Sequence, residues 1–265
     1  MAINDYGIRE ARASARVAVA ATVVLTLTSG CTFYQPKADR AAPRSTAAAA
    51  APPDAPATLP WVSAMVARNG TDITVYSGPG DARCKELWQP RATITEQDAG
   101  RVVIAVQARI VDATDCAASG RAVPVAAPPQ PQPHDGRPIR DAATGSTPPI
   151  YFERDLPDLG SDKRWSPFSS HWMSTEQSWH QGYNGPGGSV LLLSAQPTAG
   201  VVLPAAVTTS PIGSRQGTIT GAAGKSWTVW WEVGEVTYSL RLEPPEGGTF
   251  TLKQFKQEIA RLRWP

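Results

Sequence analysis

The chain is poor in the residue types that most often reveal a chemical function. Its 265 residues include only three Cys and three His, and charged residues make up 18%, below the ~25% typical of globular domains. No CxxC pair and no His cluster is present, so we expect no metal site. The sequence also has no phosphate-binding loop and no G-x-S-x-G motif, so we expect no cofactor and assign no catalytic residue. The net charge of +2 gives no reason to expect nucleic acid as a partner.

The sequence also lacks an apolar stretch of the ~20 residues that a membrane-spanning helix requires. The uncharged run Val17–Leu27 has 11 residues and follows a segment with three arginines. Small residues then precede Cys31, which resembles a bacterial lipobox, although Thr28 stands where Leu is usual. Residues 1–30 are therefore predicted to be a signal peptide and Cys31 the lipidated residue, anchored at the outer face of the cytoplasmic membrane. An ordinary secretory peptide or an uncleaved anchor is the alternative.

Residues 31–60 are rich in Ala and Pro and short of the aromatic and branched residues that build a core. Their prolines predict an extended, semi-rigid tether. Beyond it we expect a disulfide-tied β subdomain over 61–146 and a β-rich subdomain with a C-terminal helix over 147–265. The proline-rich segment 124–138 cannot be an interior strand and serves as a connector.

The cysteines and the strand pattern together predict a tied hairpin. If Cys31 carries lipid, Cys84 and Cys116 remain, and an even remainder in an exported chain predicts one disulfide. Two free thiols or half of a metal site are the alternatives. Residues 91–95 and 101–111 have strand patterns on either side of a turn, so the disulfide would connect the open ends of one hairpin.

In the second half, 189–195 and 218–220 are strand candidates, and 226–233 with 236–243 form a two-residue hairpin around Gly234-Glu235. Alternation places Trp227 and Trp231 on the apolar face and Trp230 on the other. We therefore expect Trp230 to be partly exposed, or covered by the terminal helix or the long loops.

The chain is expected to end in an amphipathic helix. Thr251 and Gln254 form a capping box, and the apolar residues that follow recur at helical spacing: Leu252, Phe255, Ile259 and Leu262. The predicted fold class is therefore α+β, mostly β, with antiparallel sheets and a C-terminal amphipathic helix packed on the second sheet.

Three of the nine tryptophans, Trp165, Trp172 and Trp179, lie in a polar, glycine-rich stretch. Aromatic side chains among polar groups can stack on sugar rings or anchor a protein interface. The alternative is a small packing cluster beneath that stretch.

Three features carry a family resemblance: the export signal with Cys31 and its tether; the segments ITVYSGPGDARC, TITEQDAGRVVIAV and DGRPIRDAATG; and SWTVWWEVGEVTYSLRLE with the closing helix. In these the chain is similar to lipoproteins of actinobacterial cell envelopes. That family has no established activity, so the resemblance implies export and anchoring but no site residue. We expect a lipid-anchored extracytoplasmic protein with a non-catalytic binding, sensing or assembly role toward an envelope protein or glycan. The alternative is a hydrolase or carbohydrate-active enzyme with its site in Ser161–Gly188.

Overall fold

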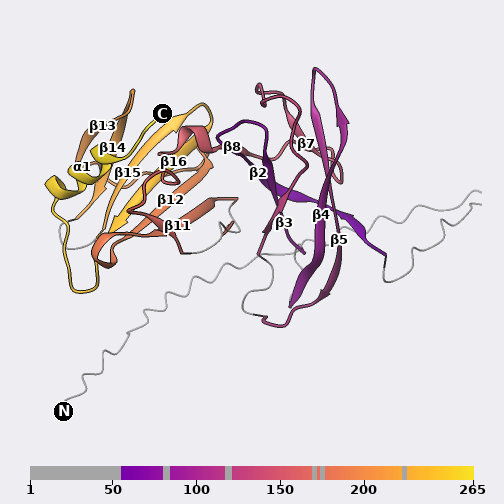
Figure 1. Ribbon diagram of the computed structural model, residues 1–265, viewed down its shortest axis with the longest axis horizontal. Coiled ribbons are helices and arrows are strands. Elements are labelled where there is room, and N and C mark those ends of the chain that lie inside the picture. Colours follow the sequence, from indigo (N-terminus) through magenta and orange to yellow (C-terminus); the bar gives the residue numbers. More distant parts are fainter. Residues whose placement is uncertain (1–54, 80–83, 117–120, 169–171, 174–176, 223–225) are drawn as a thin grey trace, which may run out of the picture. The chain divides into compact units, whose positions relative to one another are not determined.

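The computed structural model describes residues 55–79, 84–116, 121–168, 172–173, 177–222 and 226–265 (Figure 1). Over these ranges the chain is mostly β, with three sheets and one α-helix near the C-terminus, which confirms the predicted fold class. Pairing is antiparallel apart from two short parallel pairs, β2 with β8 and β5 with β7.

The first sheet has the strand order β1–β5–β4, and β7 also pairs with β5. Its members are β1 (Ala57–Leu59), β4 (Lys85–Gln97), β5 (Val102–Asp112) and β7 (Ile139–Asp141). Strands β4 and β5 form the predicted hairpin. Alternate residues of β5 are buried from Val102 to Ala108, as predicted, but Ile110 is 43% exposed. In the described sheet, β1 and β7 pair with β5 only up to Ala108, and beyond it β4 is the remaining partner. This end of the hairpin therefore extends beyond the other strands of the sheet, which explains why Ile110 is exposed.

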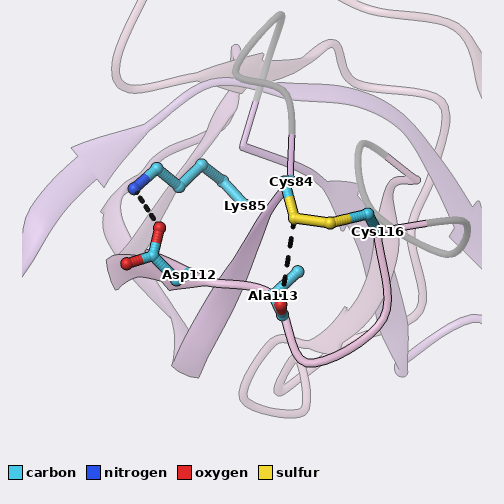
Figure 2. The surroundings of a disulfide bond; sticks show 5 residues. All are labelled: Cys84, Lys85, Asp112, Ala113 and Cys116. Atoms are coloured by element: carbon cyan, nitrogen blue, oxygen red, sulfur yellow. Dashed lines mark hydrogen bonds and ion pairs between the residues drawn. A yellow bond between two sulfur atoms is a disulfide. The ribbon is translucent and has the colours of Figure 1, made fainter.

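The predicted disulfide joins Cys84, just before β4, to Cys116, just after β5. The two Cα atoms are 4.5 Å apart. Figure 2 shows that the adjacent Lys85 and Asp112 form an ion pair across the hairpin, with 2.6 Å between Nζ and Oδ1. The backbone N–H of Ala113 also donates to the carbonyl of Cys84. The disulfide therefore ties the open end of the hairpin, as expected.

The second sheet packs against the first. Its order is β6–β3–β2–β8, with β2 (Trp61–Val66), β3 (Ile73–Ser77), β6 (Val123–Ala126) and β8 (Ile150–Phe152). Strand β6 contains Pro124 and lies at the edge of the sheet. Proline has no backbone N–H, and an edge strand tolerates it because one side of the strand has no partner strand. Buried side chains of both sheets form one cluster, and the Trp61 indole N–H crosses it to the carbonyl of Ile104, 3.1 Å away.

The third sheet is formed by the C-terminal half of the chain. Its order is β10–β11–β12–β16–β15–β14–β13, and β9 also pairs with β11. Its strands are β9 (Ser166–Pro167), β10 (Trp172–Met173), β11 (Trp179–Asn184), β12 (Val190–Pro197), β13 (Thr208–Ile212), β14 (Arg215–Gly221), β15 (Trp227–Val233) and β16 (Val236–Glu243). Two 3-10 turns complete the connections, η1 (Glu153–Asp155) and η2 (Pro186–Gly188). The β15–β16 hairpin has the predicted register, and Gly234 adopts the positive φ of 59° that a primed two-residue turn requires.

Helix α1 (Leu252–Arg261) begins with the predicted capping box between Thr251 and Gln254. Phe255 and Ile259 are buried in the cluster formed by the inner face of the third sheet, so the helix packs on that sheet as expected. Within the described residues, no helix combines the length and apolar character needed to cross a bilayer.

The second sheet contributes side chains to both clusters. Ala64 and Val66 face the first sheet, whereas Met65 and Tyr76 join the cluster of the third sheet. The subdomain boundary expected between residues 146 and 147 divides the strands of this second sheet. Strand β8 comes after the boundary in the chain, but it pairs with β2, which comes before it.

Candidate functional site

The tryptophans singled out in the sequence do not form an exposed platform. Trp165 and Trp179 are only 5% and 3% exposed and belong to the cluster beneath the third sheet. The Trp165 ring occupies the space that a Cβ at Gly185 would need. This burial favours the packing alternative for both residues. Trp172 lies in β10 by its backbone, whereas its side chain, like Cys31, lies outside what the structure describes.

A different tryptophan lies on the outer face of the third sheet. Trp227 and Trp231 are buried against side chains of the C-terminal segment, with ring centroids 6.5 Å from Phe255 and 5.1 Å from Trp264 respectively. Trp230 points the other way and is half-buried, as the alternation predicted. Helix α1 packs on the inner face and so does not cover it.

Strand register places small hydroxyl side chains on both sides of Trp230. It pairs with Ser239 of β16 and with Thr218 of β14. Ser194 of β12 lies beyond Ser239 in the same row. The indole N–H donates a 2.9 Å hydrogen bond to Oγ1 of Thr220, which fixes the ring orientation. The ring is thus fixed on a polar face without a large neighbour in either paired position.

An open cavity of 540 Å³ lies beside this ring. Its walls are Trp230, the polar side chains of Gln177, Ser178 and Gln196, the end of β12 at Pro197, and residues 199–202 of the loop that follows. In the described part of the chain, its lining residues carry no formal charge. We call this cavity, defined by these four side chains and the loop, the Trp230 cavity.

Hydrogen bonds hold the polar wall of the Trp230 cavity in place. The Ser178 hydroxyl donates to Oε1 of Gln196 over 3.1 Å, which directs the Gln196 amide. A hydroxyl pair between Thr237 and Thr198, 3.0 Å apart, fixes the start of the loop. These bonds leave the two amide hydrogens of Gln196 available to a ligand.

Gln177, at the rim of the Trp230 cavity, has a backbone conformation that side chains rarely adopt. Its φ is 63°, in the left-handed region. The Tyr151 hydroxyl donates a 2.6 Å hydrogen bond to its carbonyl and holds this conformation. Backbone strain of this kind concentrates at functional sites.

The nearest arrangement to a hydrolase site is the pair His180 and Ser194, with 2.9 Å between Nδ1 and Oγ. Burial lowers the pKa of His180, so the ring is neutral at pH 7. Ser194, however, lies in the middle of β12, which pairs with β11 on one side and β16 on the other. The ladders use the backbone N–H groups on either side of Ser194, so strands β11, β12 and β16 offer no oxyanion hole beside it. Among the described residues, no group of His, Cys, Asp or Glu is arranged to bind a metal.

Sequence reasoning placed Trp230 correctly but missed its polar partners. Gln177 and Gln196 come from separate segments, and only the β11–β12–β16–β15 strand order brings them to Trp230. The polar, aromatic-containing stretch around Gln177 was the available signal. Comparison with protein-family models, curated proteins and solved structures gave no match.

Proposed function

We propose that the protein is an exported, lipid-anchored binding protein, without catalytic activity, whose Trp230 cavity takes a neutral saccharide. The observation that carries the proposal is a half-buried tryptophan, fixed by a hydrogen bond, that forms one wall of a cavity. The other wall has amide and hydroxyl groups, and the described lining carries no formal charge.

This combination matches the surface of a sugar. A pyranose ring presents C–H groups on its faces and hydroxyl groups around its edge. A tryptophan ring provides a large, rigid apolar surface for the face. The amide hydrogens of Gln196 can donate to hydroxyl groups at this edge, and the side-chain amide of Gln177 can both donate and accept. The absence of formal charge in the described lining favours a neutral saccharide over an anionic one, because a buried anion without a cationic partner is costly.

The same lining supports binding over hydrolysis. Most glycosidases use two carboxyl groups, about 5–10 Å apart, on either side of the bond that is cleaved. The described lining residues of the Trp230 cavity include no Asp or Glu. The described lining would hold a saccharide without supplying an acid or a nucleophile.

Export and anchoring are supported by independent features. The basic segment, the apolar run and the small residues before Cys31 have the order of a lipoprotein signal. The disulfide between Cys84 and Cys116 is typical of an oxidising compartment. Lipid on Cys31 would hold the cavity-bearing domain at the membrane through the Ala/Pro tether.

The proposal is tested by calorimetric titration of a protein lacking residues 1–54 with neutral tetrasaccharides: cellotetraose, maltotetraose, mannotetraose and chitotetraose. At least one should bind, and Trp230→Ala should weaken it by about 30-fold, the effect of a hot spot worth about 2 kcal/mol. Gln196→Ala should weaken it less. The exposed Trp88, in the first sheet, provides a matched control, because Trp88→Ala should leave affinity unchanged. Failure of all four sugars to bind, or equal binding by the Trp230 variant, would contradict the proposal.

A further inference from the structure

A second, larger cavity adjoins the Trp230 cavity: the two share Pro197 and Ala199, but Trp230 does not line the second. It has a volume of 870 Å³, within the ~300–1,000 Å³ range of small-molecule sites. One wall is the segment 147–155, which contains β8 and η1, and the other is formed by the β15–β16 turn and the end of β12. We call it the Asp155 cavity, after the carboxylate in its lining.

The body of the Asp155 cavity is apolar. Pro148, Ile150 and Phe152 line one side, and Val233 and Val236 line the other. These side chains would accept an alkyl chain or a ring by burial of apolar surface. The apolar lining predicts the body of the ligand but not its polar group.

The carboxylate of Asp155 is the polar group of the cavity that indicates which polar group the ligand carries. The residue is 8% exposed, and its carboxylate has two described partners, one on each oxygen. Arg215 lies 3.2 Å from Oδ1, and the Tyr238 hydroxyl lies 3.3 Å from Oδ2. Both contacts are longer than the ~2.7–2.9 Å of a strong charge-assisted bond. A carboxylate accepts about four hydrogen bonds, so this buried group has unused capacity in the cavity lining.

Charge at the rim of the Asp155 cavity selects the sign of the ligand. Glu235, in the exposed β15–β16 turn, adds a second carboxylate to the lining. The cation in the lining, Arg154, has its guanidinium carbon 4.5 Å from the centre of the Phe152 ring. Arg215, outside the lining, already pairs with Asp155, so the preference for a cation rests on the open acceptor positions of the Asp155 carboxylate and on Glu235 at the cavity mouth. We infer that the Asp155 cavity binds a ligand with an apolar body and a primary ammonium group that donates to Asp155.

Three probes with one body and different heads test this inference: n-octylamine, 1-octanol and octanoate, titrated calorimetrically at pH 7.5 below their aggregation limits. Octylamine should bind with a Kd at least tenfold lower than that of octanoate, with octanol between them. Equal binding of octylamine and octanoate, or no saturable binding of octylamine, would overturn the inference.

Variants then locate the site. Val236→Trp fills the Asp155 cavity and should weaken octylamine at least tenfold, whereas Val207→Trp, at a 50% exposed position outside the cavity lining, should not. Glu235→Lys changes an exposed turn residue without touching the core, and should weaken octylamine several-fold while improving octanoate. That variant decides the question if Val236→Trp does not fold. Trp230→Ala should leave octylamine binding unchanged, so this site and the proposed saccharide site succeed or fail separately.

Discussion

Trp230 and Trp231 are neighbours in β15 and lie on opposite faces of the third sheet. Trp231 is 3% exposed, and its ring meets that of Trp264 edge-on, with centroids 5.1 Å apart. Its indole N–H also donates to the backbone carbonyl of Asp155. Trp230 instead forms a wall of an open cavity. One residue therefore stabilises the core, and the other is available for binding.

This difference predicts a graded response to truncation. Trp227→Ala and Trp231→Ala should each lower the free energy of unfolding by about 3–5 kcal/mol, because each leaves a large hole in the core. Trp230→Ala should cost about 1 kcal/mol, since it loses one partly exposed hydrogen bond and partial burial. Urea titration of the three variants measures the difference. A loss at Trp230 as large as at Trp231 would mean that the outer face is part of the core.

The disulfide is predicted to contribute substantially to stability. Chain entropy for the 33-residue loop from Cys84 to Cys116 gives about 3.7 kcal/mol, within the usual 2–5 kcal/mol lost on removal. The double variant Cys84→Ala/Cys116→Ala should therefore melt several degrees lower than the wild type. Reductant should lower the melting temperature of the wild type and leave the variant unchanged. Equal melting of oxidised and reduced wild type would contradict this account.

Local patterns predicted much of this fold, for physical reasons visible in particular residues. Alternation over 226–243 and the two-residue turn at Gly234 determine the pairing register of β15 and β16. The capping box at Thr251 determines where α1 begins. The Cys count predicted the pairing of Cys84 with Cys116.

Long-range contacts were not predictable from the same patterns. The sequence pattern around Tyr76 predicts only that it lies in a strand. In the structure, its hydroxyl accepts a 2.7 Å hydrogen bond from the indole N–H of Trp179, 103 positions away. Burial of Trp165 and Trp179 follows from such contacts and not from their polar sequence neighbours. No local pattern in the sequence marks Asp155 as buried, and its contact with Tyr238 is made only in the folded chain.

Two histidines predict a loss of stability on mild acidification. Burial lowers the pKa of both His134 and His180 from 6.5 in the folded state. His134 also stacks near Phe152, with ring centroids 6.0 Å apart. Below pH 6.5 the unfolded chain binds protons that the folded chain does not, so the free energy of unfolding should fall as pH drops from 7 to 5. Each proton contributes at most about 1.4 kcal/mol per pH unit.

The measurement is urea unfolding of the wild type and of His134→Asn/His180→Asn at pH 7, 6 and 5. The double variant should lose less stability over this interval than the wild type. Carboxylates with a lowered pKa, such as Asp162, act at a lower pH, because their stabilisation is lost only as pH falls below about 4. Identical pH profiles for the two proteins would contradict the assignment to these histidines.

Lipidation is predicted at Cys31. In a bacterial host that processes lipoproteins, the full chain should partition into detergent, and its mature N-terminal peptide should begin at Cys31 with acyl mass attached. Cys31→Ala should remove that mass and leave unprocessed precursor, whereas the matched Cys84→Ala should retain the lipid. A mature N-terminus well away from Cys31, without acyl mass, would exclude the anchor.

The central claim is that a saccharide contacts Trp230. The most direct measurement is a 15N–1H spectrum of the nine indole groups, with the Trp230 signal assigned by its absence in Trp230→Phe, recorded during titration with the tetrasaccharide that binds best. The account predicts a saturable shift of the Trp230 signal, while the signals of the buried Trp179 and Trp231 stay in place. A Trp230 signal that does not move at saturating sugar would contradict it.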